Sequence, residues 1–285
     1  MSDVGLPLCA TSSISWGAHD GGAIDAGGRW QACLNGMPMV SDLFVDGHRV
    51  AWRVLGSGPP LLAPECNYSW TSTMVDAMSR DFTLIVATPT DFGVSERVGA
   101  PYVPARWATE MEAVLDHLGV DRCGVFGYSF TGAFGPWLAQ QLPSRIAAVV
   151  AGGFPLLGSY EITAADVRSQ CADIEADLAT YAAIHEERFD PRAGLAFYEN
   201  LAALPDDSLV DSCPCPLYCF WGDEDTDAVA MVMSNSELSH GLADRGVTHR
   251  VIRGFDHEGL NAQLELAWPE VSVWLMHQLP VGGAA

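Results

Sequence analysis

The stretch that decides the fold is residues 123–135, which read CGVFGYSFTGAFG. It begins as a short apolar strand, turns sharply at Ser129 and continues as a helix of small and apolar residues. A serine at such a turn is held away from the backbone, so its hydroxyl can meet both a base and a substrate carbonyl. Gly127 and Gly132 stand where strand and helix must approach closely. The usual pattern is G-x-S-x-G, and its last position is Thr131 here, so an ordinary strand-to-helix loop also stays open.

Outward from this stretch, short buried-type strands alternate with helices. Alternating apolar residues on both sides of Asp46 and Gly47 predict a hairpin over 41–55. The strands predicted after it span 61–63, 82–87, 122–127, 146–151, 216–221 and 248–252. The helices predicted between and after them span 69–78, 104–118, 130–142, 231–245 and 260–279. This alternation predicts an α/β fold with a mostly parallel sheet covered by helices on both faces.

Two segments do not follow the alternation. Residues 154–212 are helix-prone and acidic without a strand signal, which predicts a helical cap, or lid, inserted between core segments 41–153 and 213–285. Residues 1–40 are glycine-rich and predict an N-terminal arm that is either flexible or packed on the surface. A homo-oligomer held together by this arm stays open.

Composition excludes several classes of partner. The 285 residues carry a formal net charge of −22, and all 14 basic residues are arginine. Such a field repels nucleic acid and anionic membrane surfaces, so neither is expected as a partner. We find no apolar run long enough to span a bilayer and no secretory signal, so a cytoplasmic location is expected. The eight cysteines are predicted to be reduced. Cys213 and Cys215 form no C-x-x-C pair and Cys219 lies in a predicted strand, so no metal site is predicted.

A serine nucleophile needs a base, usually histidine, and a carboxylate that orients the base. In a parallel sheet such groups are expected at the carboxyl ends of the strands. Asp223, Asp225 and Asp227 follow the strand predicted at 216–221. Of the eight histidines, His257 alone lies in a glycine-flanked turn directly after the last predicted strand. The order serine, aspartate, histidine is typical of the α/β-hydrolase triad.

Over about residues 41–280 the chain resembles the α/β-hydrolase fold superfamily. Residues 127–132 resemble its nucleophile elbow, and residues 255–257 resemble the turn that carries its histidine. Residues 222–225 resemble its G-x-x-D acid turn, which favours Asp225 over Asp223 and Asp227. Residues 92–95 resemble its structural G-x-S turn, with Thr88 and Asp91 in place of the usual Asp and Gly. The resemblance implies an eight-stranded-type sheet with a cap.

The resemblance also implies where an oxyanion would bind. One donor is the backbone N–H of Phe130, by its position after the serine. The second donor follows the first parallel strand, often within a His-Gly pair that is absent here. Pro64 has no N–H, so Glu65 or Cys66 is expected to supply the donor.

The reaction expected from these residues is hydrolysis of a carboxylic ester or lactone of a small, mostly apolar substrate. Ser129 is the nucleophile, His257 the base and Asp225 the residue that orients it. No cofactor and no metal are expected. A serine in place of a nucleophilic aspartate argues against a dehalogenase or an epoxide hydrolase. C–C bond hydrolysis, acyl transfer and non-hydrolytic ligand binding on the same fold stay open. The aromatic residues expected to line the substrate pocket are Tyr68, Trp70, Tyr128, Phe130 and Phe154.

Overall fold

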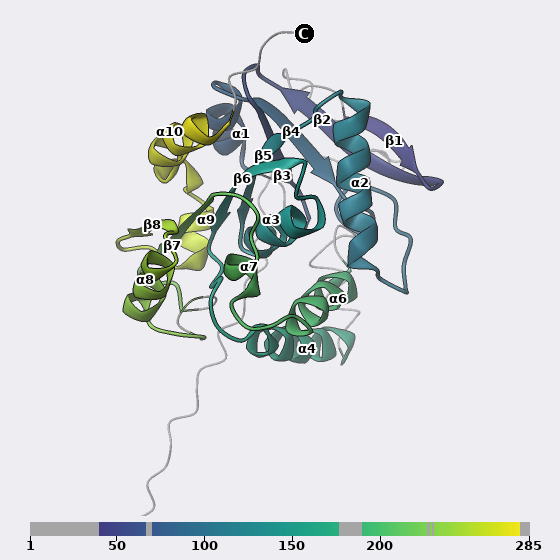
Figure 1. Cartoon of the computed structure of the whole chain (residues 1–285). Coiled ribbons are helices and arrows are strands. Elements are labelled where there is room, and N and C mark those ends of the chain that lie inside the picture. Colours follow the sequence, from purple (N-terminus) through teal and green to yellow (C-terminus); the bar gives the residue numbers. More distant parts are fainter. Residues whose placement is uncertain (1–39, 67–69, 177–189, 227–228, 230, 280–285) are drawn as a thin grey trace, which may run out of the picture.

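A computed structural model describes residues 40–66, 70–176, 190–226, 229 and 231–279 (Figure 1). The predicted arm 1–40 lies outside these residues except for its last residue. Within the described chain, eight strands form one sheet in the order β1-β2-β4-β3-β5-β6-β7-β8. Their bounds are β1 Ser41–Val45, β2 His48–Leu55, β3 Pro60–Pro64, β4 Thr83–Thr88, β5 Cys123–Tyr128, β6 Ile146–Gly152, β7 Leu217–Gly222 and β8 Thr248–Ile252. The mostly parallel sheet that the sequence predicts is confirmed.

The sheet is antiparallel only at its beginning. β1 and β2 pair in the predicted hairpin, with Val45 opposite His48 across a turn in which Asp46 and Gly47 have φ values of 50° and 86°. β2 pairs antiparallel with β4, and from β4 to β8 every neighbouring pair is parallel. The carboxyl ends of these six strands therefore lie at one edge of the sheet, where a site is expected.

Helices cover both faces of the sheet (Figure 1). Apolar side chains of α2 (Pro104–His117), α3 (Phe130–Gln141) and α8 (Asn235–Asp244) belong to the core on one face. Those of α1 (Ser72–Ser79), α9 (His257–Asn261), the 3-10 turn η1 (Leu264–Leu266) and α10 (Trp268–Gln278) belong to the core on the other face. No helix within the described residues is long and apolar enough to cross a membrane.

Two predicted helices have different limits in the structure. α8 begins at Asn235 and not near 231, because Ser234 and Glu237 form a capping box that starts the helix there. The single helix predicted for 260–279 is instead α9, η1 and α10. α10 begins at Trp268 with Pro269 in its first turn, where the missing N–H of proline costs no hydrogen bond.

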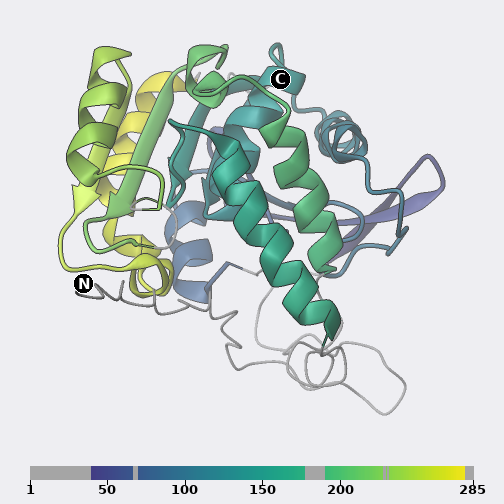
Figure 2. The ribbon, with the colours of Figure 1, turned by 90° about the horizontal axis from the view of Figure 1, so that it is seen from below.

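The segment between β6 and β7 contains three described helices and, among its described residues, no strand. They are α4 (Tyr160–Ala176), α6 (Pro191–Ala202) and α7 (Ser208–Asp211). α4 and α6 lie side by side (Figures 1 and 2). Phe197 of α6 is fully buried, with its ring 4.8 Å from Phe130 and 5.7 Å from Phe134 of α3. The inserted helix α6 therefore packs on the end of α3 that begins next to Ser129.

The turn after β4 is closed by buried hydrogen bonds. Ser95 donates its hydroxyl to the carbonyl of Thr88 at 2.6 Å and accepts the N–H of Ala51 at 2.8 Å. Asp91 has a φ of 71°, the region that glycine adopts most readily. Its carboxylate accepts the N–H groups of Val98 and Gly99, both at 2.7 Å, which holds this conformation.

A second buried carboxylate lies beside this turn. Glu110 of α2 accepts the N–H of Thr90 at 2.8 Å and its hydroxyl at 2.6 Å. Arg106, one turn earlier in α2, is paired with Asp91 and lies 3.6 Å from Glu110. Burial raises the pKa of the Glu110 carboxyl, although the two hydrogen bonds from Thr90 oppose this shift.

Candidate active site

Ser129 lies at the sharp turn between β5 and α3. Its backbone has φ 55° and ψ −122°, a conformation that L-residues rarely adopt and that typically costs about 1–3 kcal/mol. The turn is held because the N–H of Ser129 donates to the carbonyl of Gly152 on β6 at 2.8 Å. The side chain is partly exposed although its neighbours Tyr128 and Phe130 are buried. The hydroxyl is thus presented at the carboxyl edge of the sheet.

Small residues and one hydroxyl allow this turn. A side chain on Gly127 would overlap the carbonyl of Thr131, and one on Gly132 would overlap the carbonyl of Gly152. The close approach expected at both glycines is therefore present. Thr131 accepts the N–H of Tyr128 and donates to the carbonyl of the same residue, both at 2.9 Å. Thr131, which departs from the usual glycine, thus ties the helix to the strand, a contact that the sequence did not indicate.

His257 follows β8, the strand at one edge of the sheet, and its side chain contacts Ser129. It is the first residue of α9, which follows β8, and the residue is 5% exposed. Its Nε2 lies 2.9 Å from the Ser129 hydroxyl. The Tyr128 hydroxyl donates to the backbone carbonyl of His257 at 2.8 Å, and the two rings lie 5.1 Å apart. The residue before the serine therefore holds the histidine in position.

Asp225 completes the chain of hydrogen bonds. Its Oδ2 lies 2.8 Å from Nδ1 of His257, and the residue is 1% exposed. With Asp225 ionised, Nδ1 carries the proton of the neutral ring, and Nε2 is free to accept the proton of Ser129. Asp223 has a different role, because its carboxylate accepts the N–H of Gly254 at 2.6 Å. Asp227 lies outside the described residues.

The backbone N–H groups of Glu65 and Cys66, the two expected candidates for the second oxyanion donor, have different hydrogen bonds in the structure. The N–H of Glu65 donates to the carbonyl of Ala87 at 2.9 Å, within the pairing of β3 with β4. Glu65 is therefore wrong as an oxyanion donor, because its N–H continues the parallel ladder. The N–H of Cys66 donates to no acceptor in the part of the chain that the structure describes. Phe130 is the first residue of α3, so its N–H has no partner inside the helix.

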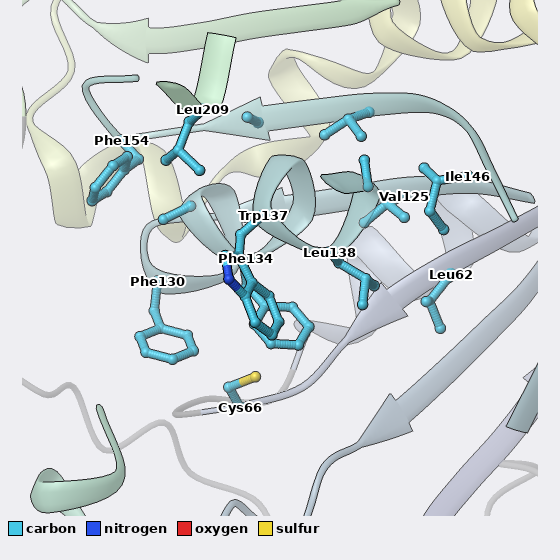
Figure 3. Close-up of a cluster of buried hydrophobic side chains, with 14 of the residues drawn as sticks. Leu62, Cys66, Val125, Phe130, Phe134, Trp137, Leu138, Ile146, Phe154 and Leu209 are labelled. Carbon is cyan, nitrogen blue, oxygen red and sulfur yellow. The ribbon is translucent and has the colours of Figure 1, made fainter. Parts of the chain in front are cut away.

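Neither acidic side chain of residues 65–66 adds an unpaired negative charge to this edge of the sheet. The Glu65 carboxylate accepts Nη2 of Arg53 at 2.9 Å and the N–H of Trp70 at 3.1 Å, so its charge is paired. Burial, and then the charge of Glu65, raise the pKa of the Cys66 thiol well above its usual value. Figure 3 shows Cys66 below the aromatic side chains of α3, in the same core cluster as Phe130. Cys66 therefore adds an apolar, uncharged thiol to this edge.

The expected pocket aromatics have mixed positions. Tyr68 lies outside the described residues. Trp70 and Tyr128 belong to the core on the α1/α10 face, where Trp70 packs 5.3 Å from Phe126 and Tyr128 packs 5.1 Å from His257. Phe130 and Phe154 belong to the core on the α3 side, and both are labelled in Figure 3.

A side chain that the sequence did not indicate joins these two rings. Tyr198 of α6 lies 5.6 Å from Phe130 and 6.3 Å from Phe154. Phe130, which follows Ser129 in the chain, Tyr198 and Phe154 thus form a continuous aromatic wall. Among the described residues no group of three or more His, Cys, Asp and Glu side chains is arranged to hold a metal ion.

Comparison with known proteins places this geometry in a fold. No protein-family model matches the chain. A thermophilic esterase from Thermogutta terrifontis superposes with a TM-score of 0.63 at 18% identity, covering 85% of this chain and 100% of the esterase. The enol-lactonase from Burkholderia xenovorans LB400 superposes with a TM-score of 0.62 at 18% identity, covering 83% of this chain and 100% of the lactonase. The chain has the α/β-hydrolase fold.

Within the α/β-hydrolase fold, curated relatives match only part of the sequence. The soluble epoxide hydrolase of Corynebacterium sp. (strain C12) is 28% identical over 101 residues, which is 34% of this chain and 35% of that protein. The chain spans about a third of the length of the curated relatives it matches. Ser129 lies between β5 and α3 of this fold, Asp225 follows β7, and His257 follows β8.

Proposed function

We propose that this protein is a serine hydrolase that cleaves a carboxylic ester or lactone of a small, mostly apolar substrate. The observation that carries the proposal is the unbroken chain from the Ser129 hydroxyl through both nitrogens of His257 to the buried carboxylate of Asp225, with contacts of 2.9 and 2.8 Å. This arrangement removes a proton from a hydroxyl that is otherwise a poor nucleophile at neutral pH. The strained turn at Ser129 supports it, because the strain presents the hydroxyl.

The reaction has two halves. The Ser129 oxygen attacks the acyl carbon while its proton passes to Nε2 of His257, and Asp225 stabilises the imidazolium. The carbonyl oxygen becomes an oxyanion, for which the N–H of Phe130 and the N–H of Cys66 are the proposed donors. Collapse breaks the bond to the leaving oxygen, which takes the proton from Nε2. Water then attacks the acyl-enzyme with His257 as base, releasing the acid and restoring Ser129.

The surroundings favour an apolar acyl group without negative charge. Phe130, the residue after Ser129, continues through Tyr198 to Phe154 in the aromatic wall, and the Glu65 carboxylate is paired with Arg53. The formal net charge of −22 disfavours anionic substrates, since the field of the whole protein acts on their approach. Ester or lactone is therefore the substrate class we propose, and the aromatic wall is the proposed acyl site.

The test combines covalent labelling with turnover. A fluorophosphonate probe is expected to label the wild type, and the protein is expected to turn over members of a panel of p-nitrophenyl esters, lactones, thioesters and diketones. Ser129→Ala is expected to abolish labelling and reduce turnover by at least about 1,000-fold. Ser236→Ala is the matched control, because Ser236 also contacts a histidine, His240, at 3.3 Å, on the exposed face of α8.

Two outcomes would contradict the proposal. One is a wild type that neither reacts with the probe nor turns over any compound of the panel. The other is a Ser129→Ala variant that keeps wild-type turnover. Turnover of diketones alone would replace the ester and lactone assignment by C–C bond hydrolysis with the same three residues.

A further inference from the structure

A pair of thiols lies away from Ser129, in the turn between α7 and β7. The turn is Cys213, Pro214 and Cys215, followed by Pro216. It precedes the amino end of β7, whereas Ser129 follows the carboxyl end of β5, which runs parallel to β7 in the same sheet. Six residues of β7 span roughly 20 Å. The thiols therefore belong to the opposite edge of the sheet from the proposed hydrolase site.

The two sulfurs are in contact. Sγ of Cys213 lies 3.9 Å from Sγ of Cys215 and 3.5 Å from the carbonyl oxygen of Cys215. A disulfide has an S–S distance of about 2.05 Å, so the sulfurs must approach by roughly 2 Å, within the reach of rotation about the side-chain bonds. Two backbone hydrogen bonds hold the turn in place. The N–H of Cys213 donates to the carbonyl of Val210 at 3.1 Å, and the N–H of Val149 donates to the carbonyl of Pro216 at 3.0 Å.

The pair is also accessible. Cys213 and Cys215 are both partly exposed, whereas the other cysteines that the structure describes are buried, namely Cys66, Cys123, Cys171 and Cys219. Both residues are therefore partly open to solvent, while their side chains pack against the outside of the core on the α3 side. This combination of contact and exposure distinguishes the pair from the buried thiols.

The two thiols differ in acidity. The contact between the two thiols lowers the pKa of Cys213, although burial partly opposes this effect. The same contact, together with burial, raises the pKa of Cys215. Cys213 is thus the sulfur that ionises first and attacks, and Cys215 is the sulfur that follows.

We propose that Cys213 and Cys215 form a thiol–disulfide exchange site that reacts with small, neutral or cationic disulfides. The Cys213 thiolate attacks one sulfur of R–S–S–R, the S–S bond breaks, and one RS⁻ leaves. The Cys215 thiol then gives up its proton, its sulfur attacks Cys213, and the second RS⁻ leaves. Each thiolate that leaves takes up one proton. The protein loses two thiol hydrogens and gains one S–S bond, while the reagent is reduced to two R–SH molecules.

The charge of the protein sets the preference for the reagent. With a formal net charge of −22, the field slows the approach of an anionic disulfide such as oxidised glutathione. Cystamine, which is cationic, and hydroxyethyl disulfide, which is neutral, carry no such penalty. We expect cystamine to react fastest and oxidised glutathione slowest, with the difference shrinking in high salt.

The experiment treats the reduced, full-length protein with each reagent, blocks remaining thiols by alkylation, and maps disulfides by peptide mass spectrometry. The expected product is a bond within the peptide that contains Cys213 and Cys215, reversed by dithiothreitol. Cys215→Ser is expected to stop at a mixed disulfide on Cys213. Cys213→Ser is expected to stop at a mixed disulfide on Cys215, because no second sulfur is left in the turn to close a bond. Cys171→Ser, at a buried thiol, is the control.

Two results would overturn the proposal: no bond in this peptide of the wild type, or a wild type that stops at a mixed disulfide. Both are read on the wild type and need no variant to fold. Unfolding curves of each variant show whether its thiol reactivity comes from a folded protein. None of these measurements depends on the activity of Ser129.

Discussion

Replacing Gly132 by alanine tests how strictly the packing of α3 on the sheet positions Ser129. A methyl group at Gly132 would overlap the backbone carbonyl of Gly152 on β6, and backbone cannot rotate away as a side chain can. α3 must retreat from β6 by roughly 0.5 Å, which already forfeits about a quarter of each contact's dispersion energy. Such overpacking typically costs about 1–3 kcal/mol, against a gain of about 1 kcal/mol from the higher helix propensity of alanine.

Gly135→Ala is the matched control in the same helix. Its methyl group would lie 3.1 Å from Val149 and 3.3 Å from Val125, both side-chain contacts that can adjust, while the propensity gain is the same. We expect Gly135→Ala to unfold within about 1 kcal/mol of the wild type in urea, and Gly132→Ala to be less stable than Gly135→Ala by about 1–3 kcal/mol.

Activity gives the sharper measurement. A displacement of about 1 Å in a catalytic group can cost about 100-fold in rate, so Gly132→Ala is expected to lower kcat by about 10- to 100-fold on the best ester substrate. Gly135→Ala is expected to keep kcat within about threefold, because its methyl group is farther from Ser129. Equal urea midpoints and equal kcat for the two variants would refute the reasoning that close backbone approach at Gly132 sets the position of the serine.

Three further predictions concern other parts of the molecule. Asp225→Asn leaves the contact with His257 but favours the wrong ring tautomer, so kcat should fall by at least about 1,000-fold with a folded protein by circular dichroism; unchanged kcat would exclude Asp225 as the orienting acid. Phe197→Ala, at a fully buried ring, should lower the free energy of unfolding in urea by about 3–5 kcal/mol, whereas Phe44→Ala, at a residue 68% exposed, should change it by less than about 0.5 kcal/mol. The raised pKa of Glu110 means that the folded state holds this proton more tightly than the unfolded state. The stability contributed by this proton is present below the ordinary glutamate pKa and is lost as pH rises through the raised pKa. The free energy of unfolding in urea should therefore decline less steeply with pH in Glu110→Gln than in the wild type. Parallel curves of this free energy against pH for the two proteins would contradict the prediction.

The sequence was sufficient for the sheet and for the three residues of the hydrogen-bonded chain, because each residue follows a buried strand with a turn signal. Ser129, Asp225 and His257 are far apart in the chain, yet the rule that carboxyl ends of parallel strands share one edge brings them together. Their hydrogen bonds in the structure agree with that expectation, while their catalytic roles stay a prediction.

The oxyanion segment shows where such reasoning stops. Whether Glu65 or Cys66 has a free N–H depends on where the pairing of β3 with Ala87 ends, and residue pattern does not specify register at a strand end. Trp70 and Tyr128 were assigned to a pocket because they are aromatic and near the edge. Each packs in the α1/α10 core instead, a choice between two faces that depends on the neighbouring elements.

The contacts made by Thr131 and by helix α6 were missed for different reasons. The hydroxyl of Thr131 bonds to Tyr128 three residues earlier, a local contact that needs the strained turn to exist. Phe197 and Tyr198 lie in an acidic, helix-prone insertion whose periodicity indicates a helix but not its partner. Only the folded chain shows that this helix contacts α3.

The burial of Phe197 limits how the molecule can admit a substrate. Lifting α6 away from α3 would expose a ring whose burial contributes about 1.5–3 kcal/mol. The fraction of molecules in the lifted form would therefore lie between about one tenth and about one hundredth. A ligand that binds only this form would have its apparent dissociation constant raised by about 10- to 100-fold. Access to Ser129 with α6 in place therefore gives tighter apparent binding than access by displacing that helix.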